Sequence, residues 1–243
     1  MYLQSTVVEN VAIFDMAVPG DDGGLGHLSP EEIICWAVEQ FPSLVMTSAF
    51  GLNGVALIHM LQRVSRDVPI IFVDTGCLFE ETLQTKRRIE AAYGVEVLTY
   101  TPRAEDLLPY QGCDFPGNAP DLCCNLRKVE PMRRAMEELG PAAVLSARAR
   151  FQSKTRRQLQ IVEWERAPVR VNPLAHWSRQ EIQDYVIVNQ VPYNPLHDQG
   201  YPSIGCQPCT RPVGLGEDLR AGRWAGLNKT ECGLWTTDYA AIG

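Results

Sequence analysis

Short apolar runs alternate with amphipathic stretches along most of the chain. The runs at residues 44–46 and 69–73 each lead into a loop of small or polar residues and then into a helical pattern of apolar positions. Three further runs, at 95–100, 142–146 and 169–174, also have the composition of strands. Strands that alternate with helices predict an α/β fold with a mostly parallel sheet and flanking helices.

Helix-start signals set the limits of the regular part. The run Ser-Pro-Glu-Glu at 29–32 combines a cap, a proline at the first position and acids in the first turn, and it predicts a helix to about Gln40. Ser178 caps an amphipathic pattern that runs to about Asn189. Beyond Val191 no regular pattern continues, so residues 191–243 are expected to form an irregular C-terminal segment. The chain is thus expected to have three parts: a loosely ordered arm at 1–29, an α/β domain at 30–209 and a mobile tail at 210–243.

Two loops follow the first two predicted strands, at residues 48–54 and 74–76. Parallel sheets bind ligands at the carboxyl ends of their strands, so both loops are expected in one binding site. The first loop also precedes a helix, whose start supplies backbone N–H donors for an anion. The candidate binding residues in these loops are Ser48, Gly51, Asp74, Thr75 and Gly76.

Composition limits the partners and the location. Apolar residues make up 45% of the chain and charged residues 21%, and the net charge is −7. This acidity gives no support to nucleic-acid or acidic-membrane binding. No run reaches the roughly 20 apolar residues of a membrane span, and no basic region followed by an apolar stretch marks a secretory signal. A cytoplasmic location is therefore expected, and a dense group of cations suits a small anion: Arg148, Arg150, Lys154, Arg156 and Arg157.

Eight cysteines in a reducing compartment are better explained as ligands or catalysts than as a disulfide framework. Cys206-x-x-Cys209 has a spacing that lets two thiolates reach one metal centre, and Cys123-Cys124 adds two more. Four thiolates suit either zinc or an iron–sulfur cluster. Adjacent cysteines are awkward ligands for one tetrahedral ion, whereas a cubane offers separate iron corners. A redox disulfide remains a further alternative for the Cys-x-x-Cys pair.

The longer context of these cysteines is more specific. It includes Cys-Cys-x-x-Arg-Lys-Val-Glu-Pro at 123–131, the run 191–211 around Cys206, the run 216–224, and Lys-Thr-Glu-Cys-Gly-Leu at 229–234. Together these stretches resemble assimilatory adenylyl-sulfate reductases of the sulfonucleotide reductase family, in the family's order and over roughly residues 43–234. The resemblance implies a fold related to the adenine-nucleotide hydrolases and ATP pyrophosphatases.

The resemblance also implies a cofactor and a reaction. Cys123, Cys124, Cys206 and Cys209 would hold a [4Fe–4S] cluster, which in this family accompanies adenosine 5′-phosphosulfate as the substrate. Cys232 would be the nucleophile: its thiolate attacks the sulfur, AMP leaves, and reduced thioredoxin releases sulfite from the enzyme S-sulfocysteine. A reductase of the 3′-phosphorylated nucleotide, or of both nucleotides, is the closest alternative. A non-catalytic nucleotide- or zinc-binding module is another, and a homo-oligomer is possible.

Four basic residues are assigned to the anionic substrate by the same resemblance. Lys128 would lie between cluster and substrate, Arg150 at the anionic group of the nucleotide, and Arg220 and Arg223 near the sulfo end. The chain departs from the family pattern at several positions: Asn53, Cys77, Ala147, Ala149 and Trp235, the last of which replaces a usual His. Among the other residues, Cys35 is expected to pack in the core and His197 to make a structural hydrogen bond, while Cys77 and Cys113 receive no role.

Overall fold

The computed structural model describes residues 24–111, 115–227 and 229–234. A sheet of six strands forms its centre: β1 (Leu44–Thr47), β2 (Ile70–Val73), β3 (Val97–Tyr100), β4 (Ala143–Ser146), β5 (Val162–Glu163) and β6 (Val169–Val171). The main helices are α1 (Pro30–Gln40), α2 (Leu52–Val64), α3 (Glu80–Tyr93), α7 (Glu130–Leu139) and α8 (Arg179–Val188). Shorter helices are α4 (Ala104–Leu107), α5 (Phe115–Asn118) and α6 (Pro120–Cys124).

The strand order is β3-β2-β1-β4-β6-β5. All neighbouring pairs are parallel except β5 with β6, which is antiparallel and pairs Val162 with Val171. The predicted α/β class, with its mostly parallel sheet, is therefore confirmed. Two predicted strands are shorter than expected, since β3 begins at Val97 and β6 ends at Val171. The two-residue strand β5 was not predicted, because two residues are too few to show a period.

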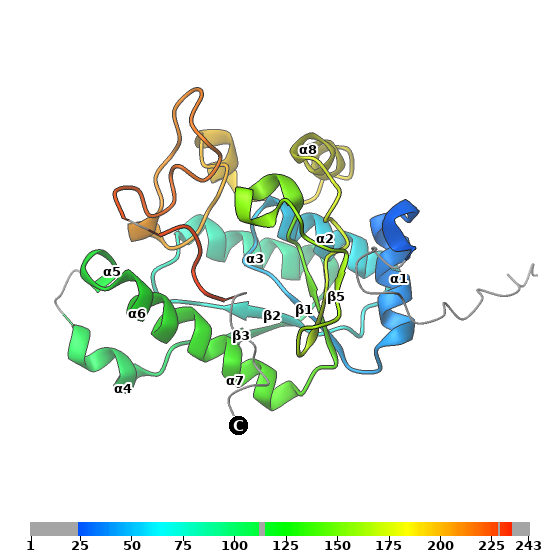
Figure 1. Cartoon of the computed structure of the whole chain (residues 1–243), viewed down its shortest axis with the longest axis horizontal. Coiled ribbons are helices and arrows are strands. Elements are labelled where there is room, and N and C mark those ends of the chain that lie inside the picture. The colour runs from blue at the N-terminus through cyan, green and yellow to red at the C-terminus, as the bar shows by residue number, and fades with distance from the viewer. Residues whose placement is uncertain (1–23, 112–114, 228, 235–243) are drawn as a thin grey trace, which may run out of the picture.

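Helices cover both faces of the sheet (Figure 1). Helices α1, α2, α3 and α8 pack together on one face, and α7 contacts β2 and β3 from the other. Side chains of a strand alternate between faces, and the core divides accordingly. Met46, Ile70 and Phe72 belong to the larger apolar cluster with α2, whereas Val45, Ile71 and Val144 pack with Met132 and Met136 of α7.

The predicted helix caps are present. Ser29 Oγ accepts from the Glu32 N–H, and the Glu32 carboxylate accepts from the Ser29 N–H, so α1 begins with a capping box. Ser178 and Glu181 form the same arrangement at α8. The expected packing of Cys35 is wrong: this thiol is exposed, because the buried face of α1 is formed by Ile33, Ile34 and Ala37.

One helical rod before β4 was not predicted. Helix α6, a π-helical turn at Asn125–Val129 and helix α7 follow each other without a break. A π-turn inserts one residue into the helical repeat and rotates the side chains that follow it. The rod therefore presents Cys123 and Cys124 at one end and the apolar face of α7 to the sheet at the other.

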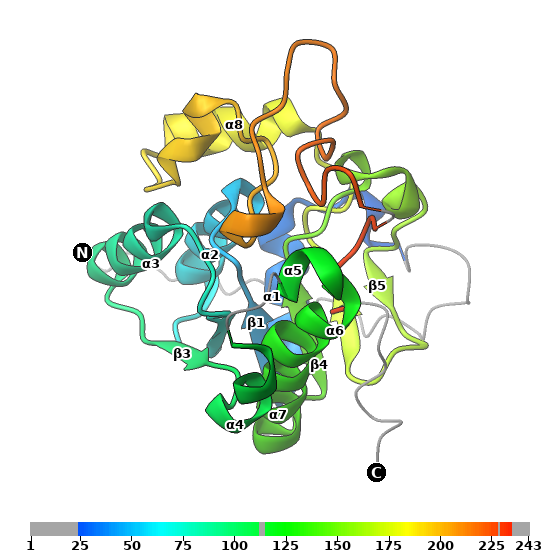
Figure 2. The same cartoon turned by 90° about the vertical axis from the view of Figure 1, so that its left-hand side faces the viewer.

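The C-terminal segment lies beside α5 and α8 as loops and short turns (Figure 2). Its described part contains two 3-10 turns, Pro195–Gln199 and Gln207–Cys209. At the other end of the chain, Leu25 of the predicted arm is buried in the core. None of the helices in the described ranges is long and apolar enough to cross a membrane.

Candidate active site

A cavity of about 290 Å³ lies at the carboxyl ends of the central strands. Its lining includes Ser48 and Gly51 after β1, Thr75 after β2 and Ser146 after β4. Strand β1 lies between β2 and β4, and the chain turns to opposite sides of it, which makes this the topological switch point of the sheet. The C-terminal segment closes the cavity with residues from Pro202 to Leu234.

The loop after β1 is fixed by polar contacts. Ser48 Oγ accepts from the Phe50 N–H at 3.1 Å, and Phe50 has a φ of 53°. At the start of α2, the Leu52 N–H donates to His197 Nε2 at 3.1 Å. The other ring nitrogen of His197 therefore carries the proton and donates to the Tyr201 carbonyl at 2.8 Å. Burial lowers the pKa of His197, so the neutral ring is favoured. The predicted structural hydrogen bond of His197 is confirmed.

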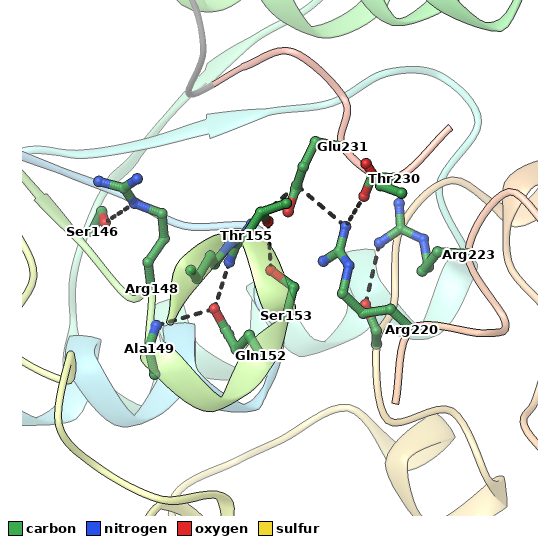
Figure 3. A network of polar contacts seen from close by, with 12 residues as sticks. Ser146, Arg148, Ala149, Gln152, Ser153, Thr155, Arg220, Arg223, Thr230 and Glu231 are labelled. Atoms are coloured by element: carbon green, nitrogen blue, oxygen red, sulfur yellow. Dashed lines mark hydrogen bonds and ion pairs between the residues drawn. The ribbon is translucent and has the colours of Figure 1, made fainter. Parts of the chain in front are cut away.

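Five cations line the cavity: Lys128, Arg148, Arg156, Arg220 and Arg223. Arg148 is largely buried, donates to Ser146 Oγ and forms an ion pair with Glu163, as Figure 3 shows in part. Burial lowers its pKa to about 10, against the attraction of Glu163. Burial also lowers the pKa of Arg220 and of Arg223, although nearby Glu231 and Cys232, respectively, oppose the shift. Such a set of partly buried cations suits a small polyanion.

Arg223 is held by close packing. Its guanidinium lies 4.4 Å from the ring centroid of Trp224, and it approaches Gly205 so closely that a Cβ there would meet Nη2 at 2.2 Å. Its Nη1 donates to the Ile204 carbonyl at 3.3 Å. Glycine at 205 thus leaves the space that the Arg223 guanidinium occupies.

Cys232 reaches the cavity on residues 229–234, which we call the Cys232 segment. The thiol is half-buried and lines the cavity together with Leu234 and Glu231. The Glu231 carboxylate pairs with Arg156 at 3.1 Å and with Arg220 at 3.2 Å. Arg220 also donates to the Thr230 carbonyl at 2.8 Å, a contact visible in Figure 3. The arrangement places a thiol at an anion-binding cavity.

A second, smaller cavity is lined by cysteines. Cys123 and Cys124 come from α6, and Cys206 and Cys209 come from the C-terminal segment. Cys77, from the loop after β2, lines the same cavity. The Gln207 N–H donates to the Cys77 carbonyl at 2.8 Å, which fixes the Cys206–Cys209 turn against that loop. The four predicted ligands thus lie together although they are far apart in the sequence.

The chemistry of this donor set fits a thiolate-bound metal group. The seven described cysteines are free thiols. Burial raises the pKa of Cys123 to about 11 and also raises those of Cys124 and Cys209, so without a metal these thiols stay protonated. The four cysteines border one shared cavity.

Lys128 connects the two cavities. It lies in the π-turn and lines both of them, as does Trp224. Burial opposes its charge, but negative charge on Cys206 and Cys232 raises the pKa of the Lys128 ammonium. Its neighbour Arg127 donates to the Thr75 carbonyl at 2.8 Å and ties the rod to the loop after β2. The cation between the cysteine cavity and the Cys232 thiol is therefore Lys128.

The structure brings most, though not all, of the predicted site residues to one place. The larger cavity is lined by Ser48, Gly51, Thr75, Lys128, Arg220, Arg223 and Cys232. Three others are not in its lining. Asp74 accepts from the Gly76 N–H and shapes the turn in which both lie. Arg150 donates from Nε to the Leu159 carbonyl at 2.8 Å and lies outside the lining. Cys113 and Trp235 lie outside the described residues.

Sequence analysis gave no individual site role to Arg148, Arg156 or Glu231, although all three line the cavity. Arg148 and Arg156, and not Arg150, line the cavity, and Glu231 pairs with Arg156. The group of five cations pointed to Arg148 and Arg156, and the Glu-Cys-Gly-Leu motif contained Glu231. What the sequence lacked was the direction of each side chain in the irregular turns after β4.

The chain is similar in sequence to known reductases. Residues 43–212 match the phosphoadenosine phosphosulfate reductase domain family. An adenosine 5′-phosphosulfate reductase of Deinococcus radiodurans is 47% identical over 85% of this chain and 81% of its own length. The reductase 1 of that name from Bacillus subtilis is 40% identical over 89% and 93%.

Among solved structures, the phosphoadenylyl-sulfate reductase of Candida auris aligns with a TM-score of 0.70 and 36% identity, over 78% of this chain and 94% of that one. The FMN adenylyltransferase of Candida glabrata, at 13% identity and a TM-score of 0.57, shares the fold alone. That likeness agrees with the α/β fold described above. The chain belongs to the phosphoadenosine phosphosulfate reductase family.

Proposed function

We propose that the chain is an assimilatory adenylyl-sulfate reductase, which converts adenosine 5′-phosphosulfate and a dithiol into sulfite, AMP and a disulfide. One observation carries the proposal: the Cys232 thiol and the cations Lys128, Arg156, Arg220 and Arg223 line one cavity at the switch point of the sheet. Support also comes from curated relatives of 38–47% identity that bear the name adenosine 5′-phosphosulfate reductase.

The reaction has two stages. The Cys232 thiolate attacks the sulfur of the phosphosulfate, an S–S bond forms, the S–O bond breaks, and AMP leaves with the electron pair. A reductant thiolate then attacks the Cys232 sulfur and releases sulfite, and its second thiol resolves the mixed disulfide. Reduced thioredoxin is the proposed dithiol, and it supplies both electrons. The arginines bind the phosphate and sulfate oxygens and stabilise the leaving charge.

Cys123, Cys124, Cys206 and Cys209 are proposed to hold a [4Fe–4S] cluster, which supplies a fixed charged centre and takes no electrons in the net reaction. Lys128 lines both cavities, so its ammonium would lie between such a cluster and the substrate and interact with both. Serine at any one of the four positions is expected to remove the brown chromophore. The matched control is Cys35→Ser, since Cys35 is exposed on α1 and lines neither cavity. A colourless, zinc-containing and fully active protein would contradict the cofactor.

Sulfite release with reduced thioredoxin tests the reaction. We expect much higher kcat/KM with adenosine 5′-phosphosulfate than with its 3′-phosphorylated form, and equal or reversed values would favour the alternative substrate. Cys232→Ser is expected to keep its chromophore and bind AMP but to release no sulfite. Without reductant, the unchanged protein should gain one sulfo group on Cys232 by mass spectrometry. A sulfo group on another cysteine, or turnover by Cys232→Ser, contradicts the mechanism.

A further inference from the structure

Glu231 is unusual among the residues of the larger cavity. It is the one acid among the described lining residues, which include five cations. An acid at this position weakens the attraction of the cavity for an anion. Since it also precedes Cys232 directly in the chain, its position and that of the thiol are coupled.

The contacts of Glu231 join two parts of the molecule. Arg156 belongs to the turn after β4, where its Nη1 also donates to Gln152 Oε1. Gln152 Oε1 in turn accepts from the Ala149 N–H at 3.1 Å, so Arg156 is fixed to the α/β domain. Arg220 belongs to the C-terminal segment and holds the Thr230 carbonyl as well. The Glu231 carboxylate pairs with both arginines, and Figure 3 shows its contact with Arg220.

The pairs are partly buried, and one oxygen is left over. The side chains of Arg156, Arg220 and Glu231 are 16%, 17% and 24% exposed. Glu231 Oε1 is buried and has no hydrogen-bond partner among the described residues. A buried acceptor without a hydrogen bond costs free energy, so the contacts of Glu231 stabilise the closed position of the Cys232 segment only modestly. A latch that closes and opens at modest cost suits a thiol that must face a nucleotide first and a protein reductant afterwards.

We infer that Glu231 is a positioning residue that latches the Cys232 segment over the cavity by clamping Arg156 and Arg220. The inference about closure concerns the nucleotide-free protein, whereas its kinetic consequence rests on the proposed function. Without the carboxylate, both arginines remain to bind the nucleotide, but the thiol is no longer held above it. The latch therefore contributes more to the position of the Cys232 thiol than to the affinity of the cavity for the anion.

The test compares Glu231→Gln with Glu217→Gln. Glu217 lies on the same C-terminal segment and makes a two-point ion pair with Arg211, yet it does not line the cavity. The same substitution there removes an ion pair without touching the latch. Iodoacetamide alkylation of the cluster-loaded, nucleotide-free proteins is followed by mass spectrometry. Rates are compared at the high-pH plateau, where the thiols are ionised and only access differs, and exposed Cys35 is the internal reference.

In Glu231→Gln the alkylation rate of Cys232, divided by that of Cys35, is expected to rise about fivefold, in line with the loss of two partly buried ion pairs. In Glu217→Gln the ratio should stay unchanged. An unchanged ratio in Glu231→Gln, or an equal rise in both variants, overturns the latch. Glu231→Asp, which keeps the charge but has a shorter reach, should give an intermediate ratio, and it decides the question if Glu231→Gln does not fold.

Kinetics separate positioning from a general loss of structure. In Glu231→Gln we expect sulfite release to slow about tenfold, the equivalent of about 1.4 kcal/mol, while the dissociation constant of AMP stays equal or falls. A weaker AMP affinity with an unchanged turnover rate overturns the positioning role. If the unchanged protein released no sulfite from either nucleotide, the proposed function would fail, and the alkylation ratios would still decide whether Glu231 closes the segment.

Discussion

The α/β domain and the C-terminal segment are held together by different forces. In the domain, the sheet and its helices enclose apolar side chains such as Met46, Leu57 and Phe72, all nearly inaccessible to solvent. In the C-terminal segment beyond Cys209, Trp224 is buried, and Arg211, Arg220 and Arg223 add ion pairs, hydrogen bonds and a cation–π contact. The domain thus fixes backbone geometry, whereas the segment brings charge and a thiol through contacts that can be remade.

Leu57→Ala is expected to have the largest effect on stability. Leu57 is fully buried on α2 against the sheet, and the truncation should lower the free energy of unfolding by about 2–5 kcal/mol. Urea unfolding followed by circular dichroism measures the change. Ile187→Ala on α8, where the side chain is 67% exposed, is the control and should differ little from the unchanged protein. Equal losses of unfolding free energy in the two variants would show that the buried core does not dominate the stability of the domain.

The same Glu→Gln substitution can be compared in the two regions. Glu163 pairs with Arg148 inside the domain, where the two side chains are 15% and 10% exposed. Its removal should cost about 3 kcal/mol, because a buried guanidinium loses its charged partner. Glu217 pairs with Arg211 in solvent, and its removal should scarcely move the unfolding midpoint. A larger loss at Glu217 would reverse the comparison.

The pH dependence of the Glu217 pair has a defined sign. The hydrogen bond from Arg211 and the N–H of Gly214 lower the pKa of Glu217 to about 2. A lowered pKa means that the pair contributes above the ordinary carboxyl pKa and is lost as the pH falls toward 2. Nuclear magnetic resonance titration of the Glu217 carboxyl checks this. A midpoint at the ordinary value for glutamate would show that the ion pair does not form in solution.

Two glycines of the C-terminal segment, Gly205 and Gly222, give the comparison with the smallest expected effects. A Cβ at Gly222 would meet the Arg211 carbonyl oxygen at 2.1 Å, so Gly222→Ala must move backbone and should loosen the bridge between Thr210 and Arg223. The three atoms nearest to a Cβ at Gly205 all belong to the Arg223 guanidinium, the end of a long side chain, so the substitution displaces that guanidinium from its place at the cavity. Gly205→Ala should therefore keep its thermal midpoint and bind AMP more weakly. Gly222→Ala should have a lower thermal midpoint and also bind AMP more weakly. Calorimetry measures both quantities.

The sequence predicted the domain better than the segment, for a physical reason. Runs such as 44–46 and 69–73 are buried on both faces, so composition alone identifies them as strands. The rod from α6 to α7 was missed because its π-turn breaks the helical period at Asn125–Val129. In the site, the four cysteines and Cys232 came from family motifs. Arg156 was named only as one of five clustered cations and Glu231 was given no role, since no periodicity governs side-chain direction in irregular turns.

The cysteine cavity also has a consequence for the order in which the molecule is made. Its two halves, Cys123-Cys124 on α6 and Cys206-x-x-Cys209, are separated in the chain by all of α7, β4, β5, β6 and α8. Any group that binds all four thiols closes a long loop of chain, so it can be inserted only after the later elements have been synthesised and docked. If the proposed cluster is bound there, its insertion is a late event in biogenesis, since a ribosome-bound chain that ends before Cys206 carries only half of the proposed ligands.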